Sequence, residues 1–135
     1  MKGVNRVVIA VKDIEKANRL FSELTGTSFH DLGVVDSFGI RAMWSCDGGI
    51  ELVSPVTPEC DVARFMAEKG EGVYAVVFNV DDIDQSYRRA QALGIQVTDT
   101  IELGEEAGFN KFKEILLDLE DTHGVFTILG EIERK

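Results

Sequence analysis

RVVIAVKDI at residues 6–14 and AVVFNVDDI at residues 75–83 are two copies of one pattern, and this repeat decides the fold. Val11, Asp13 and Ile14 of the first copy recur 69 positions later as Val80, Asp82 and Ile83. Each copy is a short β-branched run followed by an aspartate whose oxygen can accept hydrogen bonds from the first backbone N–H groups of a helix. The repeat therefore predicts a strand and then a helix, twice over.

The residues after each aspartate have helical spacing, and the spacing then changes to two. The helical apolar positions are Ile14, Ala17, Phe21 and Leu24, and in the second copy Ile83, Tyr87, Ala90 and Leu93. Gly26 and Gly94 are expected to end the two helices. The predicted strands are 27–35, 39–45 and 49–54 in the first half, then 95–103, 111–119 and 124–130 in the second, with a loop at 104–110. The predicted order is β-α-β-β-β, twice.

This order predicts one compact domain made of two modules. The first βαβββ module is expected at 1–57, a connecting helix at 58–71 and the second module at 72–135. In the connecting segment Val62, Phe65 and Met66 fall on one helical face. A single module would leave one face of its sheet uncovered. We therefore predict an α+β fold in which two βαβββ modules pair around a cupped mixed sheet.

Composition and charge exclude several classes of partner. The chain has 135 residues, of which 44% are hydrophobic and 28% charged, as in ordinary globular domains. Its net charge of −10 argues against nucleic acid and against an anionic membrane surface as partners. No apolar run approaches the ~20 residues of a membrane span, and the start reads as a strand rather than a signal peptide. Cys46 and Cys60 have no metal-type or redox-type spacing, so we expect reduced thiols and a cytoplasmic location.

Several strings together resemble a known family. They are IAVKDIEKANRLF at 9–21, GGIELVSP at 48–55, VARFMAEKGEG at 62–72, VVFNVDDI at 76–83 and HGVFTIL at 123–129. The chain resembles the vicinal oxygen chelate superfamily (glyoxalase, bleomycin resistance protein and dioxygenase), and within it methylmalonyl-CoA epimerases. The connecting string at 62–72 is the most specific, because it is not a core pattern. The resemblance covers almost the whole chain and implies a glyoxalase-like fold and a homodimer.

The resemblance also implies where a metal and a base would lie. Epimerases of this family hold a divalent ion with two histidines and two carboxylate or amide residues. Carried across by position, these fall on Arg6, Ala75, Glu51 and Ile128, so one ligand of four is present. The family's active-site carboxylate falls on Ala42. We therefore expect no metal ligands and no cofactor. A two-base epimerisation needs two proton-transfer groups flanking one carbon, and we expect that activity to be lost.

Alternation along the strands, with the former ligand positions facing the cup, gives a set of candidate ligand-binding residues. The set is Arg6, Val8, Ala42, Trp44, Glu51, Val53, Ala75, Val77, Asn79, Phe126 and Ile128. Apolar walls with a few placed polar groups are typical of a small-molecule pocket.

Three interpretations of Arg6 and Glu51 stay open. They form an ion pair that replaces the metal and joins strands, or Arg6 recognises a ligand carboxylate or phosphate. In the third interpretation both are catalytic, Glu51 as general base and Arg6 stabilising an oxyanion.

The leading hypothesis is a metal-independent protein that binds a small, partly apolar molecule, with lyase or isomerase chemistry on a carboxylate, ketone or acyl thioester left open. One alternative is a divalent-metal-dependent lyase, isomerase or epimerase with atypical ligands. A second is an antibiotic-sequestering resistance protein, for which the acidic charge favours a cationic ligand. A third is a non-catalytic interaction subunit whose cup is packed shut.

Overall fold

The computed structural model describes residues 1–135 and has the predicted β-α-β-β-β order twice, which confirms the α+β class. The elements are β1 Val4–Ala10, α1 Ile14–Thr25, β2 His30–Val35, β3 Ile40–Ser45, β4 Ile50–Pro55, α2 Asp61–Lys69, β5 Gly72–Asn79, α3 Ile83–Ala92, β6 Val97–Leu103, β7 Phe109–Leu117 and β8 Thr127–Arg134. Two 3-10 turns, η1 Asp36–Phe38 and η2 Glu105–Ala107, lie before β3 and β7. No helix is long and apolar enough to cross a membrane.

The chain divides into two compact units, and each contains four hydrogen-bonded strands. The first unit is Arg6–Tyr74, and the second is Met1–Asn5 with Ala75–Lys135. In the first unit the strand order is β2-β3-β4-β1, with β1 parallel to β4 and β3 antiparallel to both neighbours. In the second the order is β5-β8-β7-β6, with β5 parallel to β8 and β7 antiparallel to both neighbours. The two units therefore repeat one topology.

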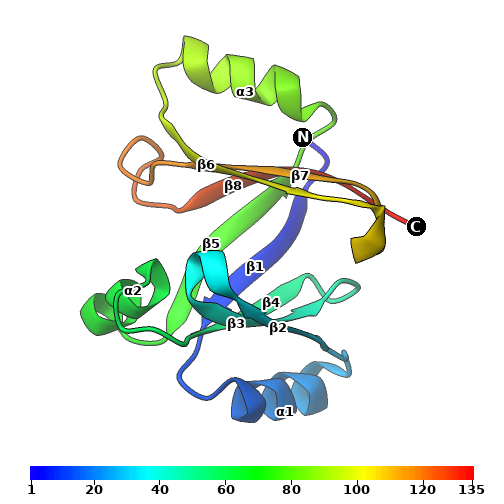
Figure 1. Ribbon diagram of the computed structural model, residues 1–135, viewed down its shortest axis with the longest axis vertical. Helices are drawn as coiled ribbons and strands as arrows, with labels where there is room; N and C mark the ends of the chain where they lie inside the picture. The colour runs from blue at the N-terminus through cyan, green and yellow to red at the C-terminus, as the bar shows by residue number, and fades with distance from the viewer. The chain divides into compact units, whose positions relative to one another are not determined.

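One helix covers one face of the strands in each unit: α1 in the first unit and α3 in the second (Figure 1). Beneath α1, Val11, Ile14, Met43 and Leu52 form a buried cluster against which Phe21 packs. The corresponding cluster beneath α3 is Ile83, Ala90, Ile115 and Leu117, with Val80, Ile95, Val97 and Leu129 against it. Strand side chains alternate between faces, so the neighbours of these residues point to the face away from the helix.

The repeated aspartates begin the two helices as predicted. Lys16 N–H donates to Asp13 Oδ1 at 3.1 Å, and Gln85 N–H donates to Asp82 Oδ1 at 3.1 Å. Each bond satisfies a donor that has no partner inside its helix, which typically stabilises a helix by ~1 kcal/mol. Gly26 ends α1 in the left-handed conformation with φ of 77°. In the second copy Leu93 closes α3, and Gly94 after it has φ of 75°.

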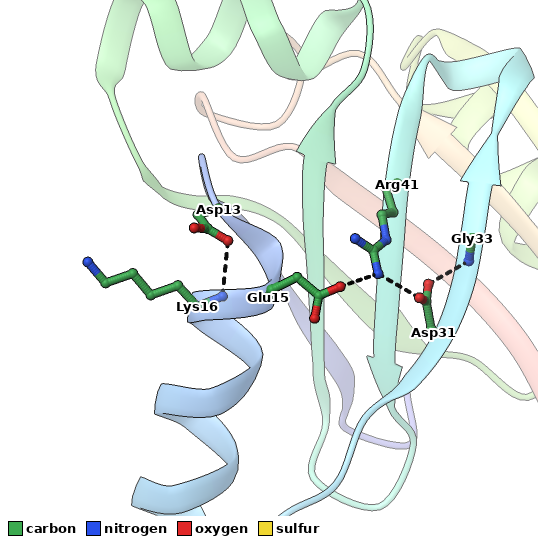
Figure 2. Close-up of polar contacts among 6 residues, drawn as sticks. All are labelled: Asp13, Glu15, Lys16, Asp31, Gly33 and Arg41. Carbon is green, nitrogen blue, oxygen red and sulfur yellow. Dashed lines mark hydrogen bonds and ion pairs between the residues drawn. The ribbon is translucent and has the colours of Figure 1, made fainter.

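Arg41 on β3 joins α1 to the sheet of the first unit (Figure 2). Its Nη2 donates to Glu15 Oε1 at 2.7 Å and to Asp31 Oδ2 at 2.6 Å. The Arg41 guanidinium, and then the Gly33 N–H, lower the pKa of Asp31, while Asp31 and then Glu15 raise the pKa of Arg41. These side chains are partly exposed, so the bonds orient β3 more than they stabilise the fold.

The structure corrects the predicted helical faces. Leu24 and Leu93 are 73% and 74% exposed, although their spacing predicts burial. In α3 the buried residues are Ile83, Ser86 and Ala90, because the helix turns its Ser86 side toward the sheet. Because Ser86 is polar, apolar spacing alone does not identify the buried face of α3.

Two predicted strand boundaries are also wrong. Residues 104–110 are not a plain loop: they contain η2, and β7 already begins at Phe109, which is 8% exposed. The last strand begins at Thr127 rather than residue 124 and continues to Arg134. Residues 118–124 form turns closed by Thr122 and Gly124 N–H groups that donate to Leu119 O, which delays the strand.

Candidate functional site

In the first unit, the sheet face opposite α1 carries the candidate residues of that module. Val8 and Trp44 lie on either side of Glu51 in the strand register, and Ala10 and Ala42 lie on either side of Val53. Register partners in paired strands share a face. Every candidate of this module is at most slightly exposed: Arg6 6%, Val8 5%, Ala42 1%, Trp44 6%, Val53 1%, and the Glu51 side chain 13%.

Arg6, Glu51 and Trp44 are in contact. Arg6 Nε donates to Glu51 Oε1 at 2.6 Å, and Arg6 Cζ lies 4.6 Å from the centroid of the Trp44 ring. The strand register explains the geometry. Arg6 is two residues before Val8 on β1, and Glu51 lies between β1 and β3 on the central strand β4. The guanidinium therefore contacts a carboxylate from β4 and an aromatic face from β3.

The Arg6 and Glu51 charges interact strongly, because both side chains are largely removed from water. Breaking a buried ion pair by removing one partner typically costs ~3–5 kcal/mol, since the other charge is left uncompensated. A desolvated cation over tryptophan contributes on the order of 2 kcal/mol. Glu51 thus orients the Arg6 guanidinium and the Trp44 ring holds its plane, as a structural ion pair or a preorganised anion site would both require.

In the second unit, the face opposite α3 carries the remaining candidates. Val77 pairs in register with Ile128 and Asn79 with Gly130, and Phe126 accepts a hydrogen bond at its carbonyl from Val76 N–H at 3.1 Å. Ala75 is 2% exposed, Val77 0% and Ile128 7%, while Asn79 and Phe126 are half-buried. This face is apolar around Val77 and Ile128.

Glu114 lies on the same face and was missed by the sequence analysis. It is 1% exposed and pairs in register with Gly130, while Leu116 pairs with Ile128. If Ile128 corresponds to Glu51, then Glu114 corresponds to Ala42 by register. Ala42 lies two residues before Trp44, the register partner of Glu51, and Glu114 lies two residues before Leu116, the register partner of Ile128. The available signal was a charged residue inside the run FKEILL at 112–117.

The side chains present do not fit the divalent ion that the resemblance implies. Ala75 and Ile128 carry no donor atoms, and the Arg6 guanidinium is a hydrogen-bond donor that cannot ligate a cation. Glu51 is engaged with that guanidinium through Oε1. No three His, Cys, Asp or Glu side chains come together in a way that could hold a metal ion. No chemical step is therefore derived through a metal.

A hollow of about 310 Å³ lies between η1 and the start of α2 in the first unit. Cys60 lines it and caps α2, its Sγ accepting from Ala63 N–H at 3.4 Å. Gly39 has φ of 64°, and a Cβ there would lie 2.7 Å from Thr57 Oγ1 and 2.9 Å from Cys60 Cβ. At Gly39 the turn therefore packs closely against Thr57 and the α2 cap, on one side of this hollow.

Tyr74 packs against α2. Its ring lies 5.2 Å from that of Phe65, edge to face. Burial, and then the charges of Asp61 and Cys60, raise the pKa of Tyr74 to about 12. Tyr74 therefore stays neutral in the physiological range and serves packing.

Each of the two βαβββ units has a helix on one face of its strands and candidate residues on the other. The model of the glyoxalase/bleomycin resistance protein/dioxygenase superfamily matches residues 5–112, and the chain belongs to that superfamily. The resemblance seen in the sequence is confirmed.

Individual proteins of similar sequence and fold were also found. The chain is 25% identical over 133 residues to the uncharacterized protein YqjC of Bacillus subtilis strain 168, covering 97% of this chain and 93% of that protein. It is similar to the methylmalonyl-CoA epimerase of Mycobacterium tuberculosis, with a TM-score of 0.81 and 25% identity over 96% of this chain and 87% of that one. A methylmalonyl-CoA epimerase in complex with methylmalonyl-CoA and NH4+ has a TM-score of 0.82 at 21% identity, covering 100% and 99%, which shows the fold alone.

Proposed function

We propose that this protein binds a small carboxylate-bearing molecule, in the class of short acyl thioesters and carboxylic acids, without a divalent metal. Arg6 recognises the ligand's carboxylate on the face opposite α1. The observation that carries the proposal is the contact of Arg6 with Glu51 and Trp44 at positions where the family's metal ligands would lie. A guanidinium held in one orientation pairs with carboxylates through its planar fork of donors.

The solved epimerase bound to methylmalonyl-CoA supplies the probe. Methylmalonyl-CoA and propionyl-CoA differ by one carboxylate, so their difference in affinity measures carboxylate recognition. A charge-assisted hydrogen bond stabilises a complex by about 1.5–3 kcal/mol. Calorimetry should therefore give at least about tenfold tighter binding of methylmalonyl-CoA to the wild-type protein.

The Arg6→Met/Glu51→Leu double variant removes the cation without leaving a buried carboxylate, and it should lose that preference. The exposed Arg64→Gln variant is the matched control and should keep it. Equal affinity for the two thioesters in the wild-type protein would refute carboxylate recognition.

Metal content tests the rest of the proposal. After incubation with Mn, Co, Ni and Zn and desalting, mass spectrometry should find metal well below one ion per chain. One tightly held ion per chain would overturn metal independence and restore the metal-dependent lyase, isomerase or epimerase alternative.

Acid–base chemistry is a second candidate function, favoured by a buried carboxylate in each unit. Glu51 lies on the face opposite α1, and Glu114 on the face opposite α3. A carboxylate held away from water is suited to proton transfer. The same titrations carried out in deuterium oxide test it, because loss of the C2 proton signal of methylmalonyl-CoA would reveal an isomerase or lyase. A homodimer and a cytoplasmic location stay predictions.

A further inference from the structure

A second cavity lies in the second unit, between α3 and its sheet. We call it the α3 groove; its volume is about 360 Å³. Phe78 on β5, Val80 just after that strand, Leu117 on β7 and Leu129 on β8 form its floor, on the α3 side of the strands. Ile95, which follows the helix, closes one wall. The volume is near the lower end for ligand sites, so the groove suits a small apolar chain.

The N-terminal residues are held beside the groove by backbone pairing within the same unit. Lys2 N–H donates to Asn79 O at 2.9 Å, and Asn79 N–H donates to Gly3 O at 2.8 Å. Met1 and Leu93, the residue that follows α3, both line the groove. Both side chains are more than 70% exposed, at 79% and 74%. They are therefore able to close over a bound chain and gain burial in doing so.

Two polar side chains of α3 stand one helical turn apart in this apolar setting. Ser86 is 7% exposed and lines the groove. Arg89 lines the groove and forms no ion pair. Residues three apart lie on one side of a helix, so the two groups are neighbours. The Ser86 hydroxyl can donate a hydrogen bond to a ligand oxygen held by Arg89.

The charge of this region selects the ligand. The chain has a net charge of −10, so an anion is attracted only where a local cation exceeds that field. Arg89 supplies such a cation beside the Ser86 hydroxyl, and the other lining residues are apolar. We propose that the α3 groove binds an aliphatic monocarboxylate, with the carboxylate at Arg89 and Ser86 and the chain over Phe78, Leu117 and Leu129.

This site differs from that of the proposed function. Leu117 and Leu129 point to the α3 side of the sheet, and the candidate Ile128 points to the other side. None of the eleven candidate residues lines the α3 groove. Failure of one proposal therefore leaves the other standing.

Octanoate is the probe, titrated into the full-length protein and followed by calorimetry and by amide chemical shifts of α3. Saturable binding with a dissociation constant of about 1 mM or tighter is expected for a ligand of this size. Arg89→Gln should weaken binding about tenfold, the loss of one charge-assisted hydrogen bond. Arg88→Gln, the adjacent exposed arginine, is the matched control and should change affinity by less than about twofold. Since both arginines are exposed, both variants are expected to unfold at the wild-type temperature.

1-Octanol separates recognition of the carboxylate from simple apolar binding. It should bind about tenfold more weakly than octanoate, because it lacks the charge. Equal binding of octanol, equal loss in the two arginine variants, or unchanged binding in Arg89→Gln would each overturn the proposal. So would the absence of saturation at 10 mM octanoate.

Discussion

Replacement of Arg6 by methionine tests whether its contact with Glu51 stabilises the first unit. Methionine keeps an unbranched stem but removes the cation and its hydrogen bond, leaving a carboxylate that is 13% exposed. Loss of one partner of a buried pair costs ~3–5 kcal/mol, a large part of the ~5–15 kcal/mol that stabilises an ordinary domain. With a urea dependence of about 2 kcal/mol per molar, the midpoint of unfolding should fall by about 2 M.

Fluorescence of Trp44 is the assay, because it is the only tryptophan and lies against Arg6. Arg64→Met is the control: its ion pair with Asp61 joins side chains 65% and 73% exposed, so its loss should cost below about 1 kcal/mol. A double-mutant cycle with Glu51→Leu should show that the Arg6→Met/Glu51→Leu protein loses at least about 2 kcal/mol less than the sum of the single variants. If Arg6→Met shifts the midpoint no more than Arg64→Met, the buried-pair reasoning is wrong.

Two further outcomes are expected. Gly39→Ala should lower the free energy of unfolding by at least about 1 kcal/mol more than Gly26→Ala in urea titrations, because both glycines have positive φ but only the Gly39 Cβ would meet Thr57 and Cys60; equal losses would contradict the close packing. The hydrogen bond from Lys111, and then that from Ile83 N–H, lower the pKa of Glu131 in the folded protein. The contribution of Glu131 to the free energy of unfolding is therefore fully present above its unfolded pKa, about 4.3, and is lost as the pH falls through the lower folded pKa. The gap in stability between wild type and Glu131→Gln should therefore be largest at pH 7 and close by pH 2–3, with exposed Glu133→Gln as control, and a gap that widens on acidification would refute it.

The repeat could be predicted from the sequence because its signals are local. Asp13 and Asp82 are followed by residues that hydrogen-bond to them, and a capping aspartate needs no tertiary information to be recognised. The βαβββ order follows from those helix starts and from the change of period after Gly26 and Gly94.

Predictions that depended on tertiary packing were less accurate. Leu93 fits the apolar spacing of α3 but is 74% exposed, because it follows the last residue of the helix. Single-strand patterns also failed to assign Glu114, since its face is defined by pairing with Gly130, sixteen positions further along the chain. The contact between Arg6, Glu51 and Trp44 joins three strands, and only the register brings them together.

The register equivalence of Ala42 and Glu114 has a consequence for how such chains are compared. A scaffold made of two halves with the same topology contains each structural position twice. A chemical group can therefore be absent from one position and present at the equivalent position of the other half, with no change of backbone. A position-by-position search of this chain for the family's acid stops at Ala42 and reports a loss. A comparison of the two halves of the chain finds the carboxylate of Glu114 at the equivalent position of the second half.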